Sequence, residues 1–153
     1  MDLILWRHAQ AYPPVPGQND LDRSLTEKGH MQAKHMARWL LPRLPQNINI
    51  HVSPSLRTQQ TAQALNLSFN ISPALTPHAE VTDLQGLVAQ HVPSAPLLLI
   101  GHQPTLGRFA ATLLTGSPIN WAMRKGALWW LITQDNSTYH NTTLKLVISP
   151  NLL

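Results

Sequence analysis

The chain has 153 residues, a length that fits one domain with a hydrophobic core of its own. It contains no cysteine, which excludes a disulfide framework, a thiolate metal site and a cysteine nucleophile. Only 12% of the residues are charged, yet 11 Lys and Arg stand against 7 Asp and Glu, a formal net charge of +4. This balance leaves three classes open: a nucleic-acid binder, a binder of anionic membranes, or an enzyme whose arginines bind phosphate.

We expect neither a targeting segment nor a membrane span. The first apolar run ends at Arg7 with no cationic leader before it, and the longest apolar stretch, Gly126–Ile132, is far shorter than the roughly 18 residues of a membrane span. We therefore expect a soluble protein, cytoplasmic by default, folded as a single domain over residues 1–153.

Strands and helices are expected to alternate along most of the chain. In chain order the patterns predict a strand at 2–8, a proline-rich loop at 12–20, and a helix capped by Thr26 and ended near Pro42 and Pro45. A strand at 48–53, a helix at 55–65, a short edge strand at 69–75 and a helix at 81–92 follow. The last of these elements are a strand at 96–100 and a helix that starts at Pro104 and ends before Gly116. The run Leu97–Ile100 is apolar on both faces, which suits a central parallel strand.

The C-terminal part has a different pattern. Residues 127–133 and 143–149 are β-like and are joined by Gln134–Ser137, which predicts an antiparallel hairpin. Trp129 and Trp130 are adjacent in the first of these strands, so they point to opposite faces and are expected to pack in the core rather than to stack on bases. The whole pattern predicts an α/β layered sandwich, with a mostly parallel sheet and a C-terminal antiparallel hairpin.

Histidines and arginines follow three of the predicted strands. The strands end in Arg7-His8-Ala9, in Ser53-Pro54-Ser55-Leu56-Arg57 and in Gly101-His102-Gln103-Pro104. Ligands of such folds bind beyond the carboxyl ends of the parallel strands, so we expect these side chains to meet at one edge of the sheet. A neutral imidazole is a nucleophile toward phosphorus, arginine forks match phosphoryl oxygens, and a backbone N–H at a helix start, that of Gln103, favours an anion.

Six blocks stand in order along the chain: Arg7-His8-Ala9, residues 23–29 (Arg-Ser-Leu-Thr-Glu-Lys-Gly), residues 52–61, Leu75-Thr76-Pro77, Gly101-His102-Gln103-Pro104, and residues 148–152. Together they resemble the histidine phosphatase superfamily, also called phosphoglycerate mutase-like, and among its branches the short SixA-type phosphohistidine phosphatases. The resemblance implies a three-layer α/β/α sandwich and a phosphatase that hydrolyses phosphohistidine on a protein.

Carried over residue by residue, the resemblance implies that His8 is the nucleophile and becomes phosphorylated in a covalent intermediate. Arg7, Arg57 and His102, with the backbone of Gln103, would form the phosphate pocket, and no metal or cofactor would be needed. Arg23 would support the neighbouring loop. Glu80 is the candidate proton donor, with His78 and Asp83 as competitors. The implied substrate is a histidine-phosphotransfer domain or another phosphorelay carrier, and the product is inorganic phosphate.

Two alternatives remain beside this interpretation. The chain could be a phosphomonoesterase for a small metabolite, or a basic nucleic-acid-binding module, although its seven Arg and four Lys are scattered along the sequence. Only 45 positions separate Arg57 from His102, which leaves room for one helix and one loop rather than a lid, and an uncapped pocket suits a protein substrate. The loop 12–20 could gate this pocket. The other histidines follow no ligand pattern: His30, His35, His51, His91 and His140.

Overall fold

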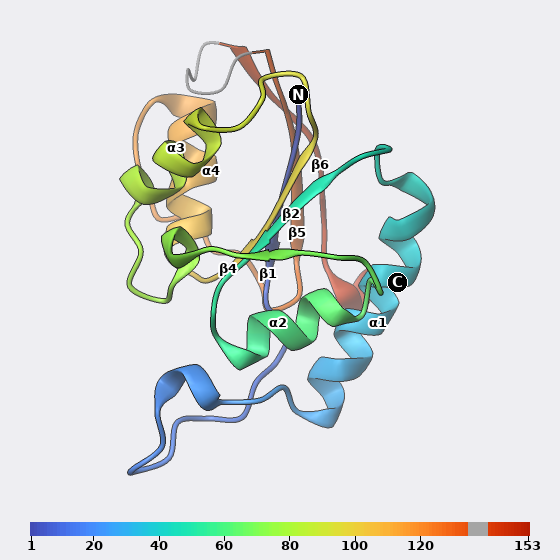
Figure 1. Cartoon of the computed structure of the whole chain (residues 1–153), viewed down its shortest axis with the longest axis vertical. Coiled ribbons are helices and arrows are strands. Elements are labelled where there is room, and N and C mark those ends of the chain that lie inside the picture. Colours follow the sequence, from blue (N-terminus) through green and yellow to red (C-terminus); the bar gives the residue numbers. More distant parts are fainter. Residues whose placement is uncertain (135–140) are drawn as a thin grey trace.

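The computed structural model describes residues 1–134 and 141–153, and these residues form a six-stranded mixed sheet. The strands are β1 (Asp2–Arg7), β2 (Asn49–Val52), β3 (Asn70–Ile71), β4 (Leu97–Gly101), β5 (Leu128–Thr133) and β6 (Thr142–Ile148). Their order is β3-β2-β4-β1-β5-β6, with parallel pairing from β3 to β1 and antiparallel pairing from β1 to β6. Figure 1 shows the carboxyl ends of the parallel strands meeting above the blue N-terminal loop.

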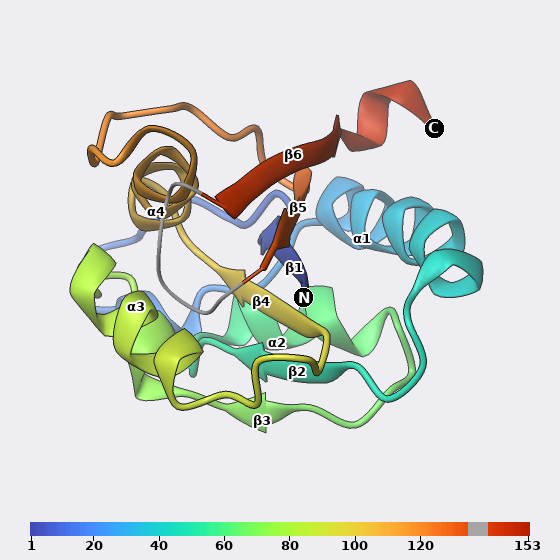
Figure 2. The same cartoon turned by 90° about the horizontal axis from the view of Figure 1, so that it is seen from above.

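Four helices cover the two faces of this sheet. They are α1 (Glu27–Leu40), α2 (Leu56–Gln63), α3 (Val81–Ala89) and α4 (Thr105–Thr115). Viewed from above, α1 and α2 lie on one side of the sheet and α3 and α4 on the other (Figure 2), and two separate hydrophobic clusters fill the spaces between the layers. The predicted three-layer α/β/α sandwich is confirmed. None of the helices in the described parts of the chain is long and apolar enough to cross a membrane.

The predicted central, parallel position of the strand at 96–100 is confirmed as well. Every residue of β4 is buried, and the strand pairs in parallel with β1 on one side and β2 on the other. Alternate side chains enter the two clusters: Leu97 and Leu99 face α3 and α4, whereas Leu98 and Ile100 face α1 and α2. A strand covered on both sides needs this unbroken apolar run.

The ends of the helices follow from local chemistry. The Thr26 hydroxyl accepts a hydrogen bond from the N–H of Gly29 at 3.0 Å, so it caps α1 as predicted. The helix ends at Leu40, and a 3-10 turn that contains Pro42 follows it. At the end of α4, Gly116 adopts a φ of 81°, the left-handed conformation that closes helices.

The edge strand is shorter than the sequence pattern indicates. We expected it to run over residues 69–75, but β3 covers only Asn70–Ile71 and a 3-10 turn, Pro73–Leu75, follows. Proline lacks the N–H that a strand ladder uses, so it ends the pairing with β2.

The C-terminal hairpin is confirmed by the antiparallel pairing of β5 with β6. Trp130 belongs to the cluster beneath α1 and α2, while Trp129 packs against the cluster on the other face, as their adjacent positions predict. Most of the predicted connection, Asp135–Ser137, lies outside the described residues, as does His140.

Candidate active site

The register of the sheet brings the two predicted histidines together. Arg7 pairs with Gly101 across β1 and β4, and the N–H of His8 donates to the carbonyl of Gly101 at 3.1 Å. His8 and His102 therefore leave neighbouring strands side by side, and their ring centroids lie 5.2 Å apart with the planes inclined by 56°. Ser53 joins them from β2, because its N–H donates to the carbonyl of Ile100.

His8 is held as a neutral imidazole with one nitrogen unprotonated. Its side chain is buried, and Nδ1 lies 2.7 Å from the carbonyl oxygen of Ala9. Since a carbonyl only accepts, Nδ1 carries the proton and Nε2 keeps its lone pair. Burial lowers the pKa of His8 to about 3, helped by the positive charges of Arg57, Arg7 and Lys125, although the bond to Ala9 acts in the opposite direction. At neutral pH this side chain is a potential nucleophile.

His102 is buried and neutral too. Burial lowers its pKa to about 2, and the neighbouring His8 and Arg57 add to that effect. Its Nε2 lies 2.9 Å from the hydroxyl of Ser53, while its Nδ1 lies 3.4 Å from Nη2 of Arg57. Because a hydroxyl either donates or accepts, Ser53 can stabilise either neutral tautomer of His102.

Arg57 enters the site from the first turn of α2. Ser55 caps that helix by accepting a hydrogen bond from the N–H of Thr58. The Arg57 side chain is only 3% exposed, and its Nη1 and Nη2 donate to the carbonyl and the carboxylate of Asp20 at 2.7 and 3.0 Å. Burial lowers the pKa of Arg57, and the bond with Asp20 opposes this. Arginine nevertheless stays charged, so the site contains a fixed cation.

Asp20 links Arg57 to the proline-rich loop. Its other carboxylate oxygen accepts from Nε of Arg23 at 2.9 Å, and Arg23 also donates to the carbonyl of Tyr12 at 2.7 Å. Burial raises the pKa of Asp20, but the bonds from Arg57 and Arg23 outweigh it, so the net shift is downward. Arg23 thus supports the loop, as the resemblance implies, and Asp20 remains a carboxylate that holds Arg57 in place.

Arg7 is anchored by residues 123–127. Its Nη1 donates to the carbonyl of Met123 at 2.6 Å, and its backbone N–H donates to the carbonyl of Ala127. The Nε atoms of Arg7 and Arg57 are both buried, and within residues 1–134 and 141–153 neither has a hydrogen-bond partner. A buried donor without a partner costs about 1–3 kcal/mol, so each of these two donors favours the binding of an anion.

Gln103 follows His102 at the start of α4. Its side chain accepts from the N–H of Gly107 and donates to the carbonyl of Trp121, each at 2.8 Å. Its own backbone N–H has no partner in the described parts of the chain, which is compatible with the anion contact that we expected.

Glu80 directly precedes α3, at the end of residues 75–80. Its backbone N–H donates to Asp83 at 2.8 Å, and the side chain is exposed. Within the described chain no hydrogen bond or ion pair connects Glu80, His78 or Asp83 to His8. The segment does approach the site through Ala79, whose carbonyl accepts from the hydroxyl of Thr105 at 2.7 Å.

Three residues near the site received no role from the sequence. Asp20 bonds to Arg57, and Ser53 bonds to His102. Partial burial lowers the pKa of Lys125, which is also close enough to Arg7, Arg23 and Arg57 for their charges to lower it further. Ser53 stands in a block that resembles the family, so it had a signal in the sequence. Asp20 and Lys125 had none.

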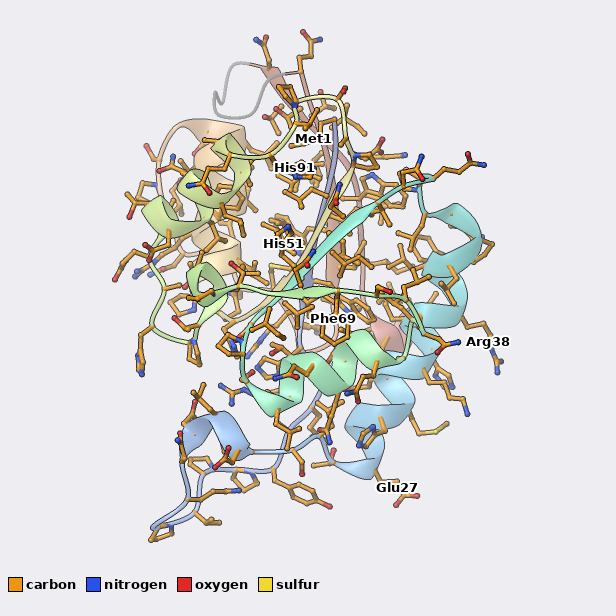
Figure 3. The ribbon with its side chains drawn as sticks, in the orientation of Figure 1. Met1, Glu27, Arg38, His51, Phe69 and His91 are labelled. Carbon is orange, nitrogen blue, oxygen red and sulfur yellow. The ribbon has the colours of Figure 1, made fainter. Side chains whose placement is uncertain are left out.

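Two of the remaining histidines lie near each other. His51, on β2, and His91, after α3, are labelled in Figure 3, and their charges interact. Across residues 1–134 and 141–153, no three His, Asp or Glu side chains are grouped as metal ligands are.

Comparisons with known proteins find relatives of this chain. Residues 3–85 match the profile of the histidine phosphatase superfamily (branch 1). The chain is 33% identical over 135 residues to an uncharacterized protein of Picosynechococcus, covering 76% of this chain and 74% of the relative. It is 33% identical over 126 residues to phosphohistidine phosphatase SixA of Escherichia coli, covering 76% of each. A solved structure of the protein histidine phosphatase SixA complexed with tungstate matches with a TM-score of 0.80 at 29% identity, over 100% of both chains.

Proposed function

Because this chain belongs to the histidine phosphatase superfamily, a family of phosphatases, we propose that it hydrolyses phosphate from a phosphohistidine side chain of a protein, through a phosphorylated His8. The observation that carries the proposal is the neutral His8, with Nε2 unprotonated, beside His102 and within reach of the positive charges of Arg57 and Arg7. The similarity to a phosphohistidine phosphatase supports this substrate class over others.

The reaction has two displacements at phosphorus. In the first, Nε2 of His8 forms a bond to phosphorus while the bond from phosphorus to the substrate imidazole breaks, and the leaving nitrogen takes up a proton. In the second, a water molecule attacks phosphorus, the bond to His8 breaks, and inorganic phosphate leaves. His8 regains its neutral form, and its hydrogen bond from Nδ1 to the Ala9 carbonyl keeps the ring oriented through both steps.

The two arginines and His102 would bind the phosphoryl oxygens. The unpartnered Nε atoms of Arg7 and Arg57 are donors that an oxyanion satisfies, and their charges stabilise the transition state without reorganisation. The backbone N–H of Gln103 adds a neutral donor. In this structure Nδ1 of His102 faces Nη2 of Arg57 at 3.4 Å and accepts from it. For Nδ1 to donate to a phosphoryl oxygen instead, Nη2 of Arg57 would turn to the anion and Nε2 of His102 would accept from the Ser53 hydroxyl 2.9 Å away.

Glu80 is the proton donor that we propose for the leaving group. It follows Ala79, whose carbonyl bonds to Thr105 one helical turn after His102, so the loop that carries Glu80 is fixed near the site. An imidazole leaves more easily than an alkoxide, so hydrolysis of phosphohistidine depends less on such an acid than hydrolysis of an ester does.

The broader features of the proposal follow from the same family membership. Residues 1–153 would act as one histidine phosphatase domain, without metal or cofactor. Its substrate would be a histidine-phosphotransfer or other phosphorelay carrier protein, and we predict the cytoplasm as its location.

A substrate panel tests the proposed function. Wild type is assayed on a histidine-phosphorylated protein, free phosphohistidine and a set of sugar phosphates, and we expect kcat/KM to be highest for the phosphoprotein. A preference for a phosphate monoester would instead support the metabolite phosphatase.

On the same panel, Glu80→Gln should lower ester hydrolysis at least tenfold and phosphohistidine hydrolysis less than threefold. Equal activity of wild type and Glu80→Gln on every substrate would refute Glu80 as the donor.

A further inference from the structure

A basic groove lies beside the candidate active site. It has a volume of about 420 Å³ and lies between α1, the loop 123–127 and the C-terminal 3-10 turn Pro150–Leu152. Figure 2 shows that this turn lies next to α1. The cations on the groove wall are Lys28, Arg124 and Lys125, with His35 beside them, and no carboxylate lines it.

Both walls of the basic groove are bonded to the backbone around His8. On one wall, the N–H of Gly126 donates to the carbonyl of His8 at 3.0 Å, and Lys125 precedes it. On the other wall, the side-chain oxygen of Gln32 accepts from the N–H of Gln10 at 2.9 Å. Each wall of the groove is therefore one hydrogen bond away from the chain segment that carries His8.

The charges of the groove are not neutralised by the protein itself. The ion pairs of the described residues use Asp20 with Arg23 and Arg57, and Asp2 with Lys145 on the hairpin. Glu27 is the carboxylate next to Lys28 in sequence, but it points outward from the start of α1 (Figure 3) and does not line the groove. Lys28 and Arg124 thus form no ion pair within the described chain.

We propose that the basic groove binds an acidic surface of the phosphoprotein substrate, next to its phosphohistidine. This inference rests on the proposed function and deepens it, because it names the property that distinguishes one phosphoprotein from another. The phosphoryl pocket recognises a group common to all such substrates, whereas complementary charge beside it selects and orients the partner. Lys125 connects the groove with the phosphoryl pocket. It lines the groove, and its pKa is lowered by burial and by the nearby charges of Arg7 and Arg57.

The test uses two synthetic peptides of equal length, each with one phosphohistidine, flanked by four glutamates in one and by four glutamines in the other. At low salt, wild type should hydrolyse the glutamate peptide with a kcat/KM about tenfold higher, and the preference should disappear at high salt. In the double variant Lys28→Glu/Arg124→Glu the preference should vanish or reverse, while kcat/KM for phosphoramidate, which cannot reach the groove, stays within twofold. Lys34→Glu, on the same helix but outside the groove, is the matched control and should keep the preference.

The outcomes separate the two proposals. If active wild type hydrolyses both peptides equally, or the double variant keeps the preference, the groove assignment is overturned and the phosphatase remains. If wild type hydrolyses neither peptide, the proposed function fails, and the inference fails with it. If the double variant loses binding to a DNA oligonucleotide but keeps the peptide preference, the groove binds nucleic acid instead.

Discussion

Asp20 is the residue whose role the structure changes most. The sequence pattern places it at the end of an irregular loop, but its carboxylate and carbonyl together hold the Arg57 fork. The contact is made by residues 37 positions apart, so no local pattern could indicate it. By contrast, His8 and His102 follow strand ends, where a general rule about α/β folds already predicts a ligand site.

Replacing Asp20 should weaken phosphate binding rather than the chemical step. In Asp20→Ala, Arg57 loses one of its two fixed contacts, and we expect KM to rise about tenfold with kcat changed less than threefold. Inorganic phosphate should inhibit this variant correspondingly less, and Asp20→Asn should be intermediate because the amide oxygen still accepts one hydrogen bond. Tighter phosphate inhibition in Asp20→Ala would contradict the positioning role and show that the carboxylate competes with phosphate.

At the scale of elements, α1 connects the family block at residues 23–29 with the site. Gly29 packs so closely on the segment after His8 that a Cβ there would lie 1.9 Å from the carbonyl oxygen of Gln10. The sequence predicts α1 and its cap because helical periodicity and capping are local. It does not predict this approach, and it does not predict that Pro73 limits β3 to two residues, because both depend on what the chain meets in space.

The approach of α1 leads to a prediction with a matched control. Gly29→Ala should lower the free energy of unfolding by about 1–3 kcal/mol, because the backbone at Gln10 must move, and should reduce kcat by displacing His8. Gly86→Ala, in α3 with open space around it, should instead stabilise the protein by about 0.5–1 kcal/mol. Urea denaturation and kinetic assays check both variants. Equal effects of the two substitutions would contradict the close packing of α1.

For the whole molecule, alternating strands and helices predict the layers correctly, and the buried run of β4 predicts its central position. The sequence does not predict where the positively charged side chains gather on the folded molecule. Arg7 and Arg57 account for part of the basic excess. The basic groove accounts for another part, because Lys28 and the neighbours Arg124 and Lys125, far from it in sequence, gather between α1, the loop and the C-terminal turn. Composition alone left nucleic acid, membrane and phosphate as equal alternatives.

Two buried neutral histidines should make the stability of the molecule fall in acid. Unfolded histidines have a pKa of about 6.5, whereas the folded values for His8 and His102 are about 3 and about 2. Between the folded and unfolded pKa values, the unfolded chain binds more protons than the folded chain does. The free energy of unfolding therefore decreases as pH falls through this range, by up to about 1.4 kcal/mol per pH unit for each histidine. Urea denaturation of wild type and His102→Asn from pH 7 to 4 should show a slope about 1 kcal/mol per pH unit smaller in the variant. Parallel slopes would contradict the depressed pKa of His102.

The central claim is that phosphate passes through His8, and rapid-quench trapping tests it most directly. A histidine-phosphorylated protein with labelled phosphate is mixed with excess enzyme, quenched in alkali within milliseconds and digested for mass spectrometry. We predict acid-labile, base-stable phosphate on His8 of wild type, and neither label nor turnover in His8→Ala, which should still bind inorganic phosphate through Arg7 and Arg57. Turnover by His8→Ala at a rate near that of wild type, or label on a different residue, would contradict the account.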